Sequence, residues 1–383
     1  MNFKPSRAFA EKLLNDFVEN NLGNYSKLRN FDYGPENRSN VSCLSPYVTH
    51  GVINEVELIK KSLSKYSFVK NEKFIQEIMW RTFWKGWMEL RPNVWTDYLL
   101  ELKTVKDKYK DDQSYEKAIS GLTDIECFNE WVGELKENNY LHNHTRMWFA
   151  SIWIFTLKLP WQLGAEFFLK YLLDGDSASN TLSWRWVAGL QSKGKHYLAQ
   201  SWNIEKFTNN RFTGIKLNES ASPITENEVY KLNDLNLDNK KSSNKFLLIF
   251  DNCLSEKNIE KVKINYEKCF LILLDNQDRK IHLSKNVLSF KEKLSMDIYK
   301  NIDQVEILQS SKAHNIFTEH KSYDVIYPNI SENLNYIMEI KSKYNLELNF
   351  LYDEKELFCW QYSKKGFFNF KKSIPNLLAK FVL

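Results

Sequence analysis

The segment from Trp161 to Trp186, WQLGAEFFLKYLLDGDSASNTLSWRW, constrains the fold of this chain more than any other. An aromatic-rich helical pattern ends there at an Asp-Gly-Asp turn, and an aspartate directly before a helix caps its free N–H groups. A new helix that starts at this turn places Asp176, Asn180 and Trp184 on one face, because residues four apart are neighbours on a helix. Acidic, amide and tryptophan side chains together are a poor composition for an apolar core. They suit a site for a large, planar, polar ligand.

The same segment closely resembles the flavin-binding motif of the DNA photolyase/cryptochrome family, W-x-x-G-x-x-Y/F-F-x-x-x-L-x-D-G-D-x-A-x-N-x-x-x-W-x-W. Three further segments resemble motifs of that family in the family's order: SCLSPYVTHG at 42–51, EIMWRTFWKG at 77–86 and YLHNHTRMWFAS at 140–151. Any one motif could arise by chance, but four in the correct order between about residues 25 and 215 are highly specific. The chain is therefore identified by resemblance as a member of this family.

Composition sets broad limits on the class of protein. A net charge of +5 and a pI of about 8.6 permit a nucleic-acid partner without requiring one. The five cysteines form no C-x-x-C pair, so we expect no metal site and no disulfide framework, but free thiols in a reducing cytoplasm. No apolar run approaches membrane-spanning length, and the N-terminus does not read as a signal peptide. The expected protein is a cytoplasmic monomer.

The periodicity of apolar residues changes along the chain. It is helical up to about Phe212, and eleven of the twelve tryptophans lie at or before Trp202. After a polar stretch, KFLLIFDN at 245–252 and CFLILLDN at 269–276 read as buried parallel strands that alternate with helices. We therefore predict an all-α FAD-binding domain of photolyase type over 1–215, a linker over 216–244, and a doubly wound, Rossmann-like α/β domain over 245–383.

The α/β domain carries no glycine-rich phosphate loop. Its closing segment, 364–381, resembles the end of the antenna domain of photolyases, which in most of the family precedes the helical domain. The resemblance therefore implies a rearranged, antenna-like domain. An unrelated α/β domain is the alternative.

The resemblance implies non-covalent FAD as cofactor and leaves any second, antenna chromophore undetermined. It assigns cofactor contacts to Tyr25, Ser42, Leu44, Ser45, Arg81, Arg146, Asp174, Asp176 and Asn180. The serines lie at a helix start that suits a diphosphate, and Tyr25 and Arg81 match positions near the phosphates. Arg146 and Asp174 are expected to pair beside the flavin ring, because a buried charge is costly alone. Asn180 matches the position that faces flavin N5, where an amide can accept or donate a hydrogen bond.

The resemblance also implies a pocket for a flipped-out pyrimidine dimer, lined by Glu77, Trp80, Asn143, His144, Met147 and Trp186. Two tryptophans, Trp80 and Trp186, would clamp the bases by stacking, and Glu77 would bind or protonate a base carbonyl. Enzymes for the 6-4 photoproduct tend to carry histidine at the Met147 position, so methionine favours the cyclobutane dimer. His144 replaces the arginine that is usual in the family, which removes one expected contact with a DNA phosphate.

Two tryptophans match the electron-transfer chain of the family. Trp184 and Trp161 correspond to its inner two members, so together with Glu77 and Asn180 they form the predicted catalytic set. The surface tryptophan of the chain cannot be placed, and its candidates are Trp95, Trp131 and Trp153.

The leading hypothesis is light-driven repair of cyclobutane pyrimidine dimers in damaged DNA, in which reduced FAD donates an electron and a carbon–carbon lyase reaction follows. The alternatives are repair of the 6-4 photoproduct, a cryptochrome-like blue-light photoreceptor without repair activity, and a flavoprotein that binds DNA with little light chemistry. His144, Val41 (at a position where the family often has threonine) and the unusual domain order favour a photoreceptor, whereas the pocket residues favour repair. The preference for single- or double-stranded DNA stays open.

Overall fold

A computed structural model of the chain describes residues 2–192, 194–226, 228–235 and 244–382. These residues form two compact units. Unit 1 joins Met1–Phe3, Asn24–Cys43 and Asn93–Tyr230, and unit 2 joins Lys4–Gly23, Leu44–Pro92 and Lys231–Leu383. The predicted linker, 216–244, lies partly outside the described residues, and the predicted domain boundaries stay a prediction.

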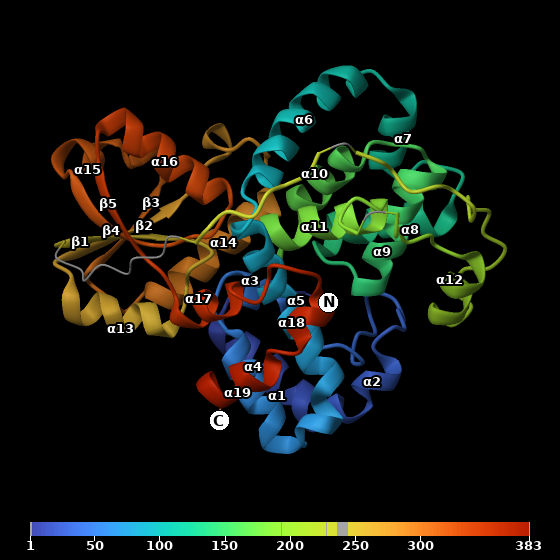
Figure 1. Ribbon diagram of the computed structural model, residues 1–383, viewed down its shortest axis with the longest axis horizontal. Helices are drawn as coiled ribbons and strands as arrows, with labels where there is room; N and C mark the ends of the chain where they lie inside the picture. Colours follow the sequence, from blue (N-terminus) through green and yellow to red (C-terminus); the bar gives the residue numbers. More distant parts are fainter. Residues whose placement is uncertain (1, 193, 227, 236–243, 383) are drawn as a thin grey trace. The chain divides into compact units, whose positions relative to one another are not determined.

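Unit 1 is helical in its described part (Figure 1). Its elements are α2 (Tyr25–Leu28), α6 (Asn93–Tyr109), α7 (Gln113–Ser120), α8 (Glu126–Asn138), α9 (Asn143–Ser151), the π-helical turn η2 (Ile152–Thr156), α10 (Trp161–Tyr171), α11 (Ser177–Ala188) and α12 (Ser201–Phe207). Helix α10 begins at Trp161, directly after Pro160, which suits a helix boundary. The short helix η1 (Leu22–Asn24) lies at the junction of the two units.

The predicted aspartate cap of α11 is confirmed. Asp176 is the N-cap, and its Oδ1 accepts a hydrogen bond from the backbone N–H of Ser179 at 2.6 Å. The helix ends at Gly189, whose φ of 90° lies in the left-handed region that favours glycine. These two signals fix the helix that carries Asn180 and Trp184.

The helices of unit 2 that precede its sheet are α1 (Arg7–Asn20), α3 (Ser45–Thr49), α4 (Glu55–Lys65) and α5 (Phe68–Glu89). The long helix α5 ends shortly before Pro92, which cannot continue a helix. Its neighbour α4 begins with a capping box, in which Asn54 and Glu57 satisfy each other's backbone N–H groups.

The sheet of unit 2 has five parallel strands: β1 (Phe246–Phe250), β2 (Lys268–Leu273), β3 (Val305–Gln309), β4 (Ser322–Ile326) and β5 (Glu347–Leu351). Their order is β3-β2-β1-β4-β5, so the direction of winding switches between β1 and β4. Nearly continuous burial of β1 and β2 explains why both read as unbroken apolar runs. The prediction of a doubly wound α/β arrangement is confirmed for these residues.

The remaining elements of unit 2 are α13 (Glu256–Asn265), η3 (Asn276–Asp278), α14 (Lys285–Tyr299), η4 (Ser310–Lys312), α15 (His314–Glu319), α16 (Glu332–Tyr344), α17 (Glu354–Trp360), α18 (Phe367–Lys371) and α19 (Ile374–Phe381). The core under α15 and α16 includes Leu248 and Phe250 of β1, and Figure 1 shows α13 on the opposite side of the sheet. After the sheet the chain returns to the helical part of unit 2, where α17 and α18 pack against α5.

Candidate functional site

The chain passes from unit 1 to unit 2 within the predicted phosphate turn. Ser42 belongs to unit 1, whereas Leu44 and Ser45 belong to unit 2. Cys43 between them has a φ of 53°, a left-handed conformation that is uncommon for a residue other than glycine. Leu44 is the N-cap of α3 without a side-chain cap, so the first backbone N–H groups of that short helix have no cap from this residue. Pro46 in the first turn agrees with the predicted helix start.

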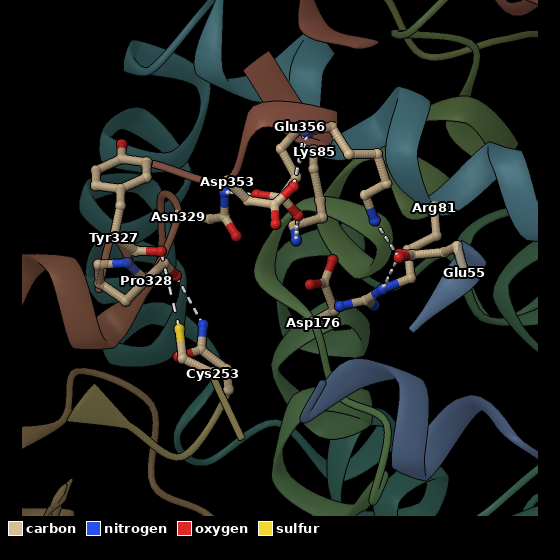
Figure 2. Close-up of polar contacts among 12 residues, drawn as sticks. Glu55, Arg81, Lys85, Asp176, Cys253, Tyr327, Pro328, Asn329, Asp353 and Glu356 are labelled. Carbon is tan, nitrogen blue, oxygen red and sulfur yellow. Dashed lines mark hydrogen bonds and ion pairs between the residues drawn. The ribbon is translucent and has the colours of Figure 1, made fainter. Parts of the chain in front are cut away.

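Arg81 on α5 is held by polar groups of α3 and α4. Its Nη1 donates to Thr49 Oγ1 at 3.1 Å, and its Nε lies 3.7 Å from Glu55 Oε1 (Figure 2). Glu55 is buried, which opposes its ionisation, but Lys355, Lys85 and Arg81 outweigh burial and lower the pKa of Glu55 to about 2. The carboxylate is thus charged at neutral pH, and it orients the guanidinium of Arg81.

Arg146 and Asp174 form the predicted ion pair. Arg146 Nη2 lies 2.9 Å from Asp174 Oδ2, and Arg146 Nε donates to Leu141 O at 2.9 Å. The Arg146 guanidinium also lies over the Tyr140 ring, 5.2 Å from its centroid. Two hydrogen bonds and a ring contact fix this cation, and Asp174 is buried, so the pair is a rigid element of unit 1.

Asn180 is oriented by a hydrogen bond to the backbone of α10. Its Nδ2 donates to Ala165 O of α10 at 2.9 Å, in a largely buried environment. One N–H of the amide is therefore used within the protein, and the oxygen Oδ1 and the second N–H are the groups that this side chain can offer to a ligand. Asp176, one turn earlier, uses Oδ1 to cap α11.

Of the predicted substrate residues in unit 2, Trp80 has an unexpected partner. Its ring is stacked on Phe367 of α18, with centroids 3.7 Å apart and an interplanar angle of 11°. Trp80 also contacts Phe83 and Trp84 on its own helix. Glu77 is half-buried on the same helix. One face of the Trp80 ring is thus occupied by the protein itself.

The predicted substrate residues in unit 1 differ in exposure. Asn143 is exposed at the start of α9, while Met147 is half-buried one turn later. Trp186 stacks on Tyr197, with centroids 5.9 Å apart. His144 Nδ1 donates to Asn30 O at 2.9 Å, and its ring lies on Trp148, so the imidazole is turned inward.

Burial lowers the pKa of His144, although the hydrogen bond to Asn30 O opposes this effect. His144 is therefore a neutral imidazole at neutral pH, and it does not supply the positive charge of the arginine that the family has there. Its contribution to DNA binding stays a prediction.

The tryptophans predicted to carry electrons are enclosed by other aromatic rings. Trp184 is 2% exposed and makes an edge contact with Trp153 at a centroid distance of 6.2 Å, whereas Trp161 stacks on Tyr98 at 5.4 Å. The three candidates for the surface position, Trp95, Trp131 and Trp153, are at most 2% exposed. None of the three is a surface tryptophan, because each is enclosed in the aromatic core of unit 1.

Gly164 was missed as a functional residue by the sequence reasoning. A Cβ atom at this position would lie 2.2 Å from Trp184 Cη2 and 3.0 Å from Trp153 Nε1. Only glycine leaves room for the two rings at this point of α10. The signal was available, since Gly164 is the fixed glycine of the W-x-x-G motif.

A buried ion network in unit 1 was also missed. Arg38 bonds to Asp32 at 3.0 Å and to Glu134 of α8, and Thr145 of α9 donates to Asp32. His142, the N-cap of α9, accepts a hydrogen bond from the N–H of His144, and burial lowers the pKa of His142 to about 3. The network ties the segment before the phosphate turn to α8 and α9. Asp32 and Arg38 lie in a loop, so no periodic pattern marks them.

Known proteins resemble the chain over its helical part. Residues 74–212 match the family model described as the FAD binding domain of DNA photolyase. The deoxyribodipyrimidine photo-lyase of Streptomyces griseus is 34% identical over 150 residues, which cover 39% of this chain and 32% of that protein. That of Agrobacterium fabrum is 30% identical over 193 residues, which cover 48% of this chain and 38% of that protein.

A third relative carries a different name. The cryptochrome DASH of Idiomarina loihiensis is 27% identical over 209 residues, which cover 53% of this chain and 45% of that protein. The chain thus spans between about a third and a half of the length of these curated relatives.

The helical fold around Arg146, Asp174 and Asn180 and the matching family model define a flavin-binding domain of the photolyase type, which agrees with the predicted cofactor. Residues 74–212, which contain three of the four motifs, thus match the FAD binding domain of DNA photolyase, in agreement with the predicted resemblance. Among the described residues, no helix is long and apolar enough to cross a membrane.

Proposed function

We propose that this protein binds FAD non-covalently and uses it for the light-driven repair of cyclobutane pyrimidine dimers in DNA. The observation that carries the proposal is the orientation of Asn180, whose Nδ2 is anchored to Ala165 O so that its amide oxygen is available to a ligand as an acceptor. An acceptor at this position suits a protonated ring nitrogen and therefore favours a reduced flavin.

The residues present fit an FAD molecule in their chemistry. The rigid pair of Arg146 and Asp174 offers a charged, hydrogen-bonding surface for the polar edge of a flavin ring. Ser42, Ser45 and Arg81 provide hydroxyl groups and a cation of the kinds that bind a diphosphate. Ser179 Oγ is buried without a hydrogen-bond partner among the described residues, so this hydroxyl group is available to bond to a ligand. When bound, FAD supplies light absorption and the transferred electron.

The chain's own residues would bind and orient the lesion. Trp80 and Trp186 offer rings for stacking, Asn143 and Glu77 offer polar groups for the base edges, and Met147 offers an apolar wall. Met147 supports the cyclobutane dimer over the 6-4 photoproduct, which the resemblance associates with a histidine there.

A cryptochrome-like photoreceptor is the second candidate, and two observations favour it. Phe367 covers one face of Trp80, and His144 is neutral and turned toward Asn30 O, so one stacking face and one phosphate contact of a repair enzyme are replaced.

We further propose that residues 245–383 form an antenna-like domain that follows the helical domain in the sequence. The five cysteines are free and buried, which fits a reducing cytoplasm. We propose a monomer.

The deciding experiment measures loss of the lesion. Purified full-length protein is incubated with an oligonucleotide that contains one cyclobutane dimer, in blue light and in the dark, after chemical reduction of its flavin. Light-dependent loss of the dimer, with an oligonucleotide carrying a 6-4 photoproduct left intact, is the expected result. Protein that contains flavin but leaves both lesions unchanged in light would refute repair and support the photoreceptor.

A further inference from the structure

The segment after α17 is strongly basic. From Leu357 to Leu383 the chain contains five lysines and no aspartate or glutamate. Lys371 pairs with Glu72 at 2.9 Å, whereas Lys364, Lys365 and Lys372 are exposed. Several exposed lysines close together in the chain raise the potential at this surface and attract a polyanion.

An exposed aromatic ring lies within this charge. Phe368 is 80% exposed, although its neighbours Phe367 and Phe370 are buried. Water disfavours a large apolar ring, and a lone exposed one needs no explanation by itself. Together with the flanking lysines, however, it has the composition of surfaces that bind unpaired nucleic acid strands, in which rings stack on bases and cations follow the phosphates.

The backbone that presents these side chains is held firmly. Phe367 stacks on Trp80, and Arg91 Nη2 donates to Lys364 O at 2.7 Å. At Gly86 of α5 a Cβ atom would lie 2.6 Å from both Ser363 Oγ and Trp360 Cδ1, so the segment packs directly on the helix backbone. Phe368 is therefore presented on an anchored element, which reduces the entropy that is lost on binding.

We propose that Lys364, Lys365, Phe368 and Lys372, named here the C-terminal strand-binding face, bind an unpaired DNA strand. Phe368 stacks on a base, and the three lysines neutralise phosphates. The bound strand flanks the lesion, a detail that rests on the proposed function because it takes Trp80 as a lesion contact. Binding of the strand itself needs neither flavin nor light.

Nucleic acid fits this face better than a lipid surface. The apolar residues of α19, Ile374, Leu377 and Leu378, are buried within unit 2 and are not available for insertion into a bilayer. One phenylalanine alone buries too little apolar area for stable membrane binding, but a single ring suffices to stack on a base. Charge and ring together therefore favour a single strand.

The test compares wild-type and variant full-length protein in their affinity for a labelled, undamaged single-stranded oligonucleotide, which is measured by fluorescence anisotropy. Phe368→Leu keeps an apolar side chain but removes the ring, and Phe368→Trp keeps a ring. We expect Phe368→Leu to weaken binding by about tenfold and Phe368→Trp to retain it. Lys364→Ala/Lys365→Ala is expected to reduce the slope of log affinity against log salt by about 1.4. The control Lys103→Ala/Lys110→Ala, which removes one exposed lysine of α6 and one directly after it, should leave the slope nearly unchanged.

Equal affinity of wild type and Phe368→Leu would overturn the proposal, as would an equal loss in the α6 control. Binding to anionic lipid vesicles that depends on Phe368 and the same lysines would also overturn it in favour of a membrane surface. A short dimer substrate without flanking bases separates this proposal from the repair activity, because Phe368→Leu should repair it as wild type does. Wild-type protein that binds the strand through Phe368 but repairs no dimer would retain this proposal and refute the repair function.

Discussion

The contact between Gly164 and Trp184 predicts a specific failure of an otherwise favourable substitution. In a helix interior, alanine is more stable than glycine by about 1 kcal/mol. The new Cβ of Gly164→Ala would, however, lie 2.2 Å from Trp184 Cη2 and 2.5 Å from Trp184 Cζ3, so the ring must move by more than 1 Å to reach the ~3.5–4.0 Å of ordinary contact.

That movement is opposed by the surroundings. Trp153 Nε1 would be 3.0 Å from the same Cβ, and it donates to Pro160 O at 2.9 Å. Overpacking of this kind costs about 1–3 kcal/mol, or more where two large rings must shift. We therefore expect Gly164→Ala to lower the free energy of unfolding by up to about 2 kcal/mol after the gain in helix propensity.

Urea denaturation followed by circular dichroism measures this difference, and Gly133→Ala in α8 is the matched control. A Cβ at Gly133 meets no atom within 4 Å, so this substitution should stabilise the protein by a few tenths to about 1 kcal/mol. Trp184→Phe removes the ring atoms that clash, so the added cost of Gly164→Ala should largely disappear in the double variant. Gly164→Ala that is as stable as Gly133→Ala would show that the ring moves freely and that the reasoning is wrong.

Three further outcomes are expected. Burial raises the pKa of Glu89 to about 7 against the opposing hydrogen bonds from Ile330 N and Tyr327 Oη, so the folded protein keeps a proton that the unfolded chain loses above about pH 4.5. The contribution of protonated Glu89 to stability is complete below about pH 4.5 and is lost as the pH rises through 7. The free energy of unfolding of Glu89→Gln, measured by chemical denaturation, should therefore rise relative to that of wild type by up to about 3 kcal/mol between pH 5 and 8. A difference that does not change with pH would contradict the raised pKa. Asn180→Asp should lower the reduced fraction of bound flavin at a fixed potential, measured by absorbance titration, because a carboxylate repels an anionic ring. An unchanged midpoint potential of the flavin would show that residue 180 does not lie beside the ring. Trp184→Phe should slow photoreduction strongly and spare lesion repair by chemically reduced protein, and equal photoreduction rates would indicate another electron route.

Local signals in the sequence were sufficient for much of the fold. Helix α5 ends before Pro92 because proline cannot continue it, and α11 starts at Asp176 because the carboxylate caps it. The pairing of Arg146 with Asp174 followed from the resemblance and from the cost of a lone buried charge. Each of these features depends on nearby residues or on a strong family motif.

Long-range contacts had no such signal. The sequence placed Trp95, Trp131 and Trp153 in an aromatic-rich region, but exposure depends on what packs around each ring, and all three are buried. The stack of Phe367 on Trp80 joins residues far apart in the chain, and hydrophobic periodicity carries no information on such a pair. For the same reason the bond between Arg38 and Glu134 could not be foreseen.

The stack of Phe367 on Trp80 makes the protein compete with its own ligands. A ring from outside can occupy that face of Trp80 only in the fraction of molecules in which Phe367 has moved away. Such aromatic pairs contribute about 0.5–1.5 kcal/mol beyond the area they bury, so even without the cost of exposing the buried Phe367 ring the open fraction is at most about a third. The apparent dissociation constant on that face is raised by the reciprocal of this fraction, while ligands of the opposite face are unaffected. To reach the same occupancy, a ligand of the face covered by Phe367 must therefore have a higher intrinsic affinity than a ligand of the opposite face.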